Sequence, residues 1–216
     1  MGYGGNAAQV LDRVISLVSC GASCVRGNHE EVTLHPPEQI RCVQDESAEW
    51  THAQLQPLQL SFLANLPLTA KLEHNVLLTH ASAHEPDQWH YVDNSNAAER
   101  SMRAAAEQDP AIRYVFSGHV HKQALYFLTP TAKLMRFTPE PGVAVPVPSH
   151  RQWLAIVGSC GQPRDDDARA MYSLFDSDAA TLTFQRVPYD HIAAAAAVRA
   201  THALPLYFAD RLEWGR

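Results

Sequence analysis

The sequence predicts an α/β fold, and three observations point to it. Helix-like and strand-like segments alternate over residues 6–121. Each strand-like segment there is short and apolar, and each is followed by glycine, histidine or asparagine. From residue 123 to residue 187 the pattern changes to short strand-like runs joined by turns rich in Pro, Gly and Asp. The alternation is typical of a sheet covered by helices, and the later runs favour antiparallel pairing.

Three helices are predicted in the first half. Residues 6–18 place five aliphatic side chains on one helical stripe, and Asn6 suits an N-cap. Residues 46–66 also have a helical pattern, in which Pro57 would interrupt or restart the helix. Residues 96–109 combine alanines with charges spaced for i,i+4 pairing, which favours a third helix. The stripe of the first helix consists of Val10, Leu11, Val14, Ile15 and Val18.

Three short buried strands are predicted between these helices. The first lies in ASCVRGNHE, residues 22–30, and breaks at Gly27. The second lies in HNVLLTHAS, residues 74–82, and the third in AIRYVFSGHVH, residues 111–121. Short apolar runs bounded by turn residues are typical of strands that are covered on both faces. The resulting order of helices and strands indicates an α/β sandwich.

The second half is predicted to be mainly β. The residues DSDAAT, 176–181, are the expected hairpin turn between its last two strands. Residues 139–150 are the most loop-like stretch, and their prolines suit an edge strand or a crossing segment. A helix over residues 191–200 ends before Pro205. Because no repeat or linker interrupts the sequence, residues 1–216 are expected to form a single domain. The strand-like runs are QALYFL, KLMRFT, QWLAIVGS, MYSLFD and TLTFQRV.

Composition excludes several classes of partner. The 17 basic and 23 acidic residues give a formal net charge of -6. This charge argues against a general nucleic-acid or anionic-membrane surface, although a local metal ion can still hold a phosphate. No apolar run approaches the roughly 20 residues of a membrane span, and the sequence does not begin with a signal-peptide pattern.

The four cysteines contain no C-x-x-C pair. Cys20 and Cys24 lie four apart, but a zinc site would need a second close pair, which the sequence lacks. Reduced thiols in the cytoplasm are therefore the simplest interpretation.

Polar residues follow the three strands of the first half. Asn28 and His29 follow the first, His80 the second, and His119 and His121 the third. If these strands are parallel neighbours, their carboxyl ends converge on one site. One amide oxygen with several imidazole nitrogens suits Mn, Fe, Zn or Ni better than Ca or Mg.

Alternatives to this metal site remain open. A lone histidine at a strand end is usually a structural residue, so only the ordered combination of all three strand ends indicates a metal site. His119 and His121 lie two apart, so on a strand they would share one face. On a turn after Gly118 they could instead point to two ions.

These motifs resemble those of the calcineurin-like metallophosphoesterase superfamily, and in particular its small bacterial single-domain branch. The matching residues are Gly27-Asn28-His29-Glu30, His80 in THAS, and Gly118-His119-Val120-His121. The stretches VGSCGQPRDD and RVPYD also resemble the C-terminal half of that branch. The resemblance covers nearly the whole chain and implies a layered α/β/β/α sandwich.

The family's D-x-H and Gly-Asp motifs have no counterpart in this sequence. The opening MGYGG resembles the stretch that follows Gly-Asp in the branch. We therefore expect a single, N-terminally incomplete domain that lacks the first β-α-β unit, about 40 residues. A lost unit would uncover a sheet edge and an apolar face, through which the chain could form a homodimer.

The resemblance implies a metal-dependent phosphoesterase that hydrolyses a small phosphate mono- or diester. The intact family site holds two divalent ions. Asn28, His80 and His119 would bind the second ion, and His121 alone would remain from the ligands of the first. His29 would instead protonate the leaving oxygen or stabilise the phosphoryl charge.

The missing motifs leave room for one ion or none, and for impaired activity. The alternative function is a non-catalytic or regulatory remnant of the same scaffold.

Two arginines are candidate substrate contacts. Arg26 precedes Gly27 and could approach a phosphate, or it could pair with a nearby acid. Arg164 in GQPRDD could contact a phosphate at the rim, or it could brace its loop against Asp165 or Asp166. The aromatic residues Trp89 and Tyr91 could line the site, although packing roles are commoner for such residues.

Overall fold

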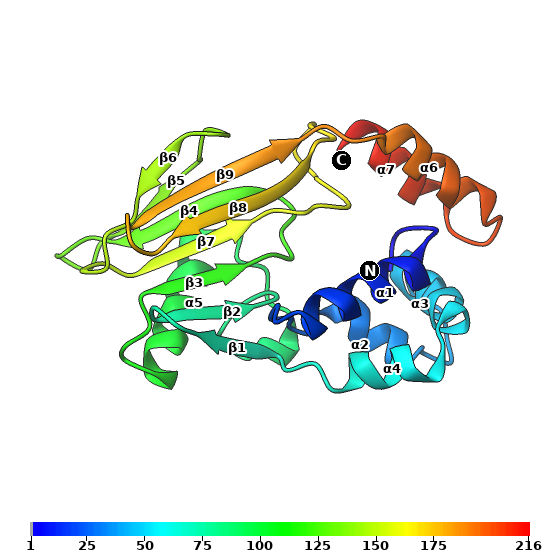
Figure 1. The fold of residues 1–216 in the computed structure, drawn as a ribbon, viewed down its shortest axis with the longest axis horizontal. Coiled ribbons are helices and arrows are strands. Elements are labelled where there is room, and N and C mark those ends of the chain that lie inside the picture. The colour runs from blue at the N-terminus through cyan, green and yellow to red at the C-terminus, as the bar shows by residue number, and fades with distance from the viewer. Residues whose placement is uncertain (1) are drawn as a thin grey trace.

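A six-stranded mixed sheet forms the centre of the protein in the computed structural model, which describes residues 2–216, with the backbone alone for residues 43 and 44 (Figure 1). The strand order is β1-β2-β3-β7-β4-β5. The neighbours β2, β3 and β7 run parallel, whereas β1, β4 and β5 pair antiparallel. The strands are β1 (Thr69–Leu72), β2 (Val76–Thr79), β3 (Tyr114–Ser117), β4 (Gln123–Leu128), β5 (Leu134–Phe137) and β7 (Trp153–Val157).

A smaller antiparallel sheet packs on one face of the first. Its strands are β6 (Ala144–Pro146), β9 (Thr181–Val187) and β8 (Ala170–Asp176), in that spatial order. The β8–β9 hairpin turns where predicted, and the Asp176 carboxylate accepts two backbone N–H bonds in the turn. The proline-rich stretch 139–150 contributes β6 at the sheet edge, which agrees with the prediction for its prolines.

The two faces of the central sheet are covered differently. Between the sheets lies an apolar cluster that includes Tyr114, Leu125, Trp153 and Phe184. On the opposite face, α5 (Ser95–Gln108) buries Met102 against β3, β4 and β7. Asn94 caps α5 by accepting the N–H of Ala97. The predicted mixed α/β fold, with a central sheet flanked by helices, is therefore confirmed.

The remaining helices lie beyond one end of the sheets. In Figure 1, α1 to α4 gather near α6 and α7, on the side of the molecule away from β5. Tyr3 and Trp50 pack against the apolar cluster of α6 and α7. These helices are α1 (Ala7–Ser19), α2 (Asn28–Leu34), α3 (Val43–Gln54), α4 (Pro57–Ala64), α6 (His191–Ala200) and α7 (Leu206–Trp214), and a short 3₁₀ helix η1 spans Pro86–Gln88. None of the helices in residues 2–216 is both long and apolar enough to cross a bilayer.

The strand predicted within residues 22–30 is wrong. Residues 22–27 have no regular structure, and α2 begins at Asn28. The unpredicted strand β1 pairs with β2 and is the terminal strand on that side of the sheet, and residues 22–27 pair with no strand. Its Arg26 N–H instead donates to the carbonyl oxygen of Pro67 at 2.8 Å.

Local turn chemistry explains the other differences. His74 and Asn75 adopt positive φ angles of 56° and 59° and close the β1–β2 hairpin. The helical pattern predicted over residues 46–66 is confirmed as two helices, and the chain restarts at Pro57 as predicted, with this proline in the first turn of α4. Helix α7 follows Pro205 and was not predicted.

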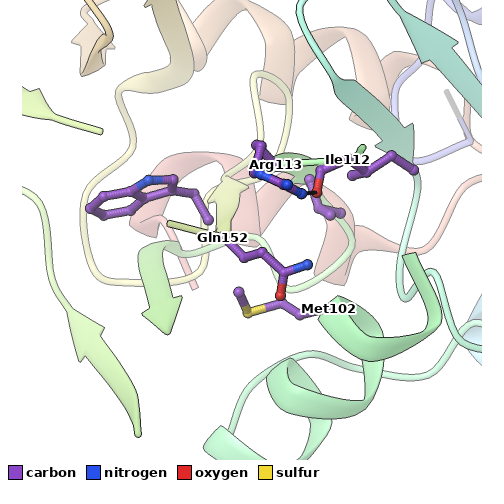
Figure 2. A pocket seen from close by; sticks show the side chains of 6 residues that line it. Met102, Ile112, Arg113 and Gln152 are labelled. Atoms are coloured by element: carbon purple, nitrogen blue, oxygen red, sulfur yellow. Dashed lines mark hydrogen bonds between the residues drawn. The ribbon is translucent and has the colours of Figure 1, made fainter. Parts of the chain in front are cut away.

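Figure 2 shows a small hollow near α5 and the β3–β7 strand pair. It is lined by Met102, Ile112, Arg113, Val115, Gln152 and Trp153, and its volume of about 0 Å³ leaves no room for a water molecule. The hollow is therefore a packing feature and not a ligand site.

We predict that Leu154→Ala lowers the free energy of unfolding by about 2–5 kcal/mol. Leu154 belongs to β7 and is fully buried in the apolar cluster that β7 forms with α5. Urea unfolding followed by circular dichroism would measure the loss. Leu174→Ala is the matched control, since Leu174 is 56% exposed and should cost less than about 1 kcal/mol. Equal losses in the two variants would contradict this account of the core.

Candidate functional site

The parallel strands β2, β3 and β7 end at the same edge of the central sheet. His80 directly follows β2, residues 118–121 follow β3, and residues 158–162 follow β7. The N–H of Gly118 donates to the carbonyl oxygen of His80 at 2.9 Å, which extends the strand pairing past the strand ends. The sequence-based expectation of convergence is thus confirmed for the second and third predicted strands, and the loop after β7 joins them.

Asn28, His80 and His119 are in direct contact at this edge. The Nε2 atom of His80 lies 2.9 Å from Asn28 Oδ1 and 3.1 Å from His119 Nδ1. Asn28 arrives from the first turn of α2, not from a strand end. These three side chains are the predicted ligands of the second ion, and the fold brings them together from three separate parts of the chain.

Gly27 permits this contact because it has no Cβ. A Cβ at position 27 would lie 2.6 Å from His80 Nδ1. The backbone N–H of Gly27 donates to Glu30 Oε2 at 2.9 Å, which fixes the start of α2. Glycine at this position therefore serves a close approach of backbone to imidazole.

His119 and His121 lie on a turn, not on a strand. Both adopt positive φ angles, 61° and 63°, which non-glycine residues seldom do. His119 stacks on the ring of Tyr91 at 4.1 Å between centroids. His121 Nδ1 donates to the carbonyl oxygen of Gln162 at 2.6 Å, which leaves its Nε2 as a lone-pair donor.

His29 is buried beside this group and is 8% exposed. Its ring packs edge-to-face on Tyr3 at 4.0 Å. The Nε2 atom of His29 has no hydrogen-bond partner among the described residues. Burial, reinforced by the nearby His80, His121 and Arg164, lowers the pKa of His29 to about 2. The imidazole is therefore neutral at pH 7 in this structure.

Tyr3, Gln162 and Arg211 belong to the site but were not singled out from the sequence. Arg164 donates to Tyr3 Oη at 3.1 Å and to Gln162 Oε1 at 3.0 Å. Arg211 donates to the same Gln162 oxygen at 3.2 Å. The only sequence signals were the glycines around Tyr3 and the GQPR stretch, and neither reveals a partner.

Both predictions for the arginines need revision. Arg26 pairs with Glu31 at 3.5 Å and does not line the pocket described below, which favours the ion-pair alternative. Arg164 does brace its loop, but through Tyr3 and Gln162 rather than the predicted acids. Asp165 is paired with Arg186, and Asp166 with Arg216.

The donor set fits one divalent ion. Two ligand atoms that each lie about 2.0–2.1 Å from an ion are about 2.8–3.0 Å apart at octahedral angles and about 3.3–3.4 Å apart at tetrahedral angles, so the two contacts of His80 are closer to the octahedral spacing. Asn28 Oδ1 and His119 Nδ1 present lone pairs to His80 Nε2, and His80 Nε2 becomes a third neutral ligand atom when its proton moves to Nδ1. Within residues 2–216, no three His, Cys, Asp or Glu side chains form a group that could hold an ion. The described residues thus offer an Asn–His–His set that one ion could use.

The site opens into a pocket of about 560 Å³. His29, His80, His119, His121 and Gln162 line one part of it. Residues from α1, α6 and α7 line another part. Trp89 and Tyr91 stand against the rings of His80 and His119, on the other side of the histidine group.

The chain is similar to proteins of known sequence and structure. No protein-family model matches it. An uncharacterized protein of Methanocaldococcus jannaschii is 26% identical over 227 residues, which covers 100% of this chain and 84% of that protein. The crystal structure of a metallophosphoesterase from Sphaerobacter thermophilus has a TM-score of 0.82 and 27% identity, and the match covers 100% of this chain and 85% of that one. A hypothetical protein from Pyrococcus horikoshii OT3 shares the fold at TM-score 0.73 and 15% identity, over 100% of this chain and 82% of that one.

We predict that Gly27→Ala weakens divalent-metal binding at least about tenfold, because the new Cβ would displace the His80 ring. Isothermal titration with Mn²⁺ would measure the affinity. Gly4→Ala is the control, because a Cβ there would meet nothing within 4 Å. Unchanged affinity in Gly27→Ala would show that the His80 position does not matter for the ion.

Acid should destabilise the protein through its buried histidines. Burial lowers the pKa of His29 to about 2, of His121 to about 3 and of His119 to about 4, and it also lowers the pKa of His80. An unfolded histidine titrates near pH 6.5. The unfolded state therefore takes up more protons below pH 6.5, and the stability that is present above that pH is lost as the pH falls.

We expect each of His29 and His121 to contribute up to about 1.4 kcal/mol per pH unit to this loss between pH 6.5 and 4. Urea unfolding without added metal at pH 7.5, 6 and 5 would measure it. His121→Gln should reduce the slope of unfolding free energy against pH by about 1.4 kcal/mol per pH unit, which corresponds to one proton. Stability that stays flat from pH 7.5 to 5 would contradict the burial of neutral imidazoles.

Proposed function

We propose that this chain, which has the fold of the calcineurin-like metallophosphoesterases, is a metal-dependent phosphoesterase. The carrying observation is the contact of His80 with Asn28 and His119, together with the pocket that His80 and His119 line. Three electron-rich atoms there share at most one proton, the one on His80 Nε2. A cation is the natural complement of such a group. The 27% identical metallophosphoesterase structure supports the reaction class.

Asn28, His80 and His119 would hold one divalent ion, of Mn, Fe, Zn or Ni. Such an ion would supply Lewis acidity toward a phosphoryl oxygen. His121 presents a second imidazole Nε2 to the same pocket, oriented by the Gln162 carbonyl. In this proposal a small phosphate mono- or diester places its phosphoryl group between these histidines and His29.

His29 would contact the leaving oxygen through its unpartnered Nε2. Because burial lowers its pKa to about 2, the neutral ring would act first as a hydrogen-bond donor to the phosphoryl group. A phosphate dianion beside the ring would raise this pKa again, because an opposite charge favours the imidazolium. Proton donation to the leaving oxygen would then follow from substrate binding.

The second candidate is a non-catalytic ligand-binding protein on the same scaffold. Two observations favour it. Within the described residues, no three His, Cys, Asp or Glu side chains form a group that could hold an ion. The ring of Tyr3 also packs beside both His29 and His121, with ring centroids 4.0 and 6.2 Å apart, so an aromatic side chain stands next to these two histidines. Metal binding without turnover would support this candidate.

His29 and His119 have separable roles in the proposal. His119→Ala should remove the bound ion and the activity together, whereas His29→Ala should keep the ion. The rate loss in His29→Ala should be about 10²–10⁴-fold on phenyl phosphate and smaller on nitrophenyl phosphate, whose leaving group needs less protonation.

Metal content after dialysis and initial rates with Mn²⁺ would measure these effects. The control is the exposed His150→Ala, which should change neither. Loss of the ion in His29→Ala would contradict the role of His29 at the leaving oxygen. If the unmodified protein hydrolyses neither ester with Mn, Fe, Zn or Ni, the enzyme proposal is wrong.

A further inference from the structure

The pocket has an apolar end that the proposed chemistry does not use. We define this end by Ala7 and Val10 of α1, Ala194 and Ala197 of α6, and Leu212 of α7. Val10 is 50% exposed although it belongs to the apolar stripe of α1, because it faces this opening. The histidines stand at the other end of the same pocket.

Small side chains create the space at the apolar end. Ala194 and Ala197 are three residues apart on α6, so they share one face of the helix. The segment 2–5 closes against that helix, since a Cβ on Gly5 would lie 2.6 Å from the Ala197 carbonyl oxygen. Replacing either alanine with a larger residue would therefore fill the pocket without changing the histidines.

The lining carries almost no charge. Among the residues that line the pocket in the described chain, none is Lys or Arg, and Glu30 is the only acid. One oxygen of the Glu30 carboxylate already accepts the N–H of Gly27. Without Lys or Arg side chains, the pocket lining cannot form ion pairs with a polyphosphate or a highly charged peptide. The lining suits an uncharged organic group.

Two buried nitrogen atoms in the pocket lining indicate a polar group on the occupant. Gln162 is 1% exposed and His29 is 8% exposed, and both line the pocket. Gln162 Nε2 and His29 Nε2 have no hydrogen-bond partner among residues 2–216. Buried polar atoms normally find partners, so a ligand oxygen at this point would satisfy them.

We propose that the pocket binds the uncharged, apolar alcohol part of a phosphate ester, with an aryl or branched alkyl body at the apolar end and its oxygen near Gln162 and His29. The substrate class rests on the proposed function, whereas binding of the alcohol does not. Hydrolysis would break the P–O bond to this alcohol. Water supplies the oxygen that replaces it on phosphorus, and a proton ends on the alcohol oxygen.

The first test measures binding without metal or turnover. Fluorescence titration of the metal-free protein with 1-naphthol, and competition by phenol, would give both affinities. We expect naphthol to bind at least about tenfold tighter, because its second ring adds buried apolar area. Ala197→Leu and Ala194→Leu should each weaken naphthol binding about tenfold or more. Ala196→Leu, on the exposed face of the same helix, should leave it unchanged.

Melting curves of the three variants would show that each is folded, and the comparison of naphthol with phenol on the unmodified protein needs no variant. Weak binding that is equal for naphthol and phenol would overturn the proposal. An equal loss in Ala196→Leu and Ala197→Leu would overturn it as well.

The second test separates this inference from the proposed function. With Mn²⁺, 1-naphthyl phosphate should be hydrolysed with a kcat/KM at least about tenfold above that of phenyl phosphate, a preference that Ala197→Leu should abolish. Turnover of both esters without a preference would overturn the inference and leave the phosphoesterase proposal intact. Tight naphthol binding that Ala197→Leu removes, without turnover of either ester, would support the pocket and contradict the enzyme.

Discussion

The shared carboxyl edge of β2, β3 and β7 is the constraint on which the site depends. Leu78 pairs with Phe116, and the Gly118 N–H continues that pairing to the His80 carbonyl. This register places the first histidine after β2 beside the first histidine after β3. The same edge brings the loop after β7 close enough for Gln162 to orient His121. A slip of one residue in any of these pairs would turn the histidines away from one another.

This sheet edge brings the neutral side chains of Asn28, His80 and His119 together away from solvent, and this has two consequences. Burial lowers the pKa of each of these histidines, so their imidazoles carry no positive charge near pH 7. Neutral imidazole and amide donors are the forms that bind divalent ions. Arg164 and Arg211 stand behind Tyr3 and Gln162 rather than in the pocket, so they act on its walls and not directly on a ligand. The pocket is therefore polar at the histidines and apolar at the helices.

Much of this arrangement could be predicted from the sequence. Apolar runs followed by glycine and histidine identified β2 and β3, and their ends supplied His80 and His119. The strand predicted within residues 22–30 was wrong, because Arg26 bonds to Pro67 in the segment before β1 and the chain then begins α2 at Asn28. Tyr3, Gln162 and Arg211 were missed because their roles arise from contacts between distant segments. Asn28 does contact His80, although it belongs to a helix start and not to a strand end.

The most direct test of the central claim is the position of a bound ion. Crystals of the protein grown with Mn²⁺ or Zn²⁺ should give an anomalous difference peak that identifies the ligands. The account predicts one peak within bonding distance, about 2.0–2.3 Å, of Asn28 Oδ1, His80 Nε2 and His119 Nδ1. A peak elsewhere, or no peak at saturating metal, would contradict the assignment of these three residues as a metal centre.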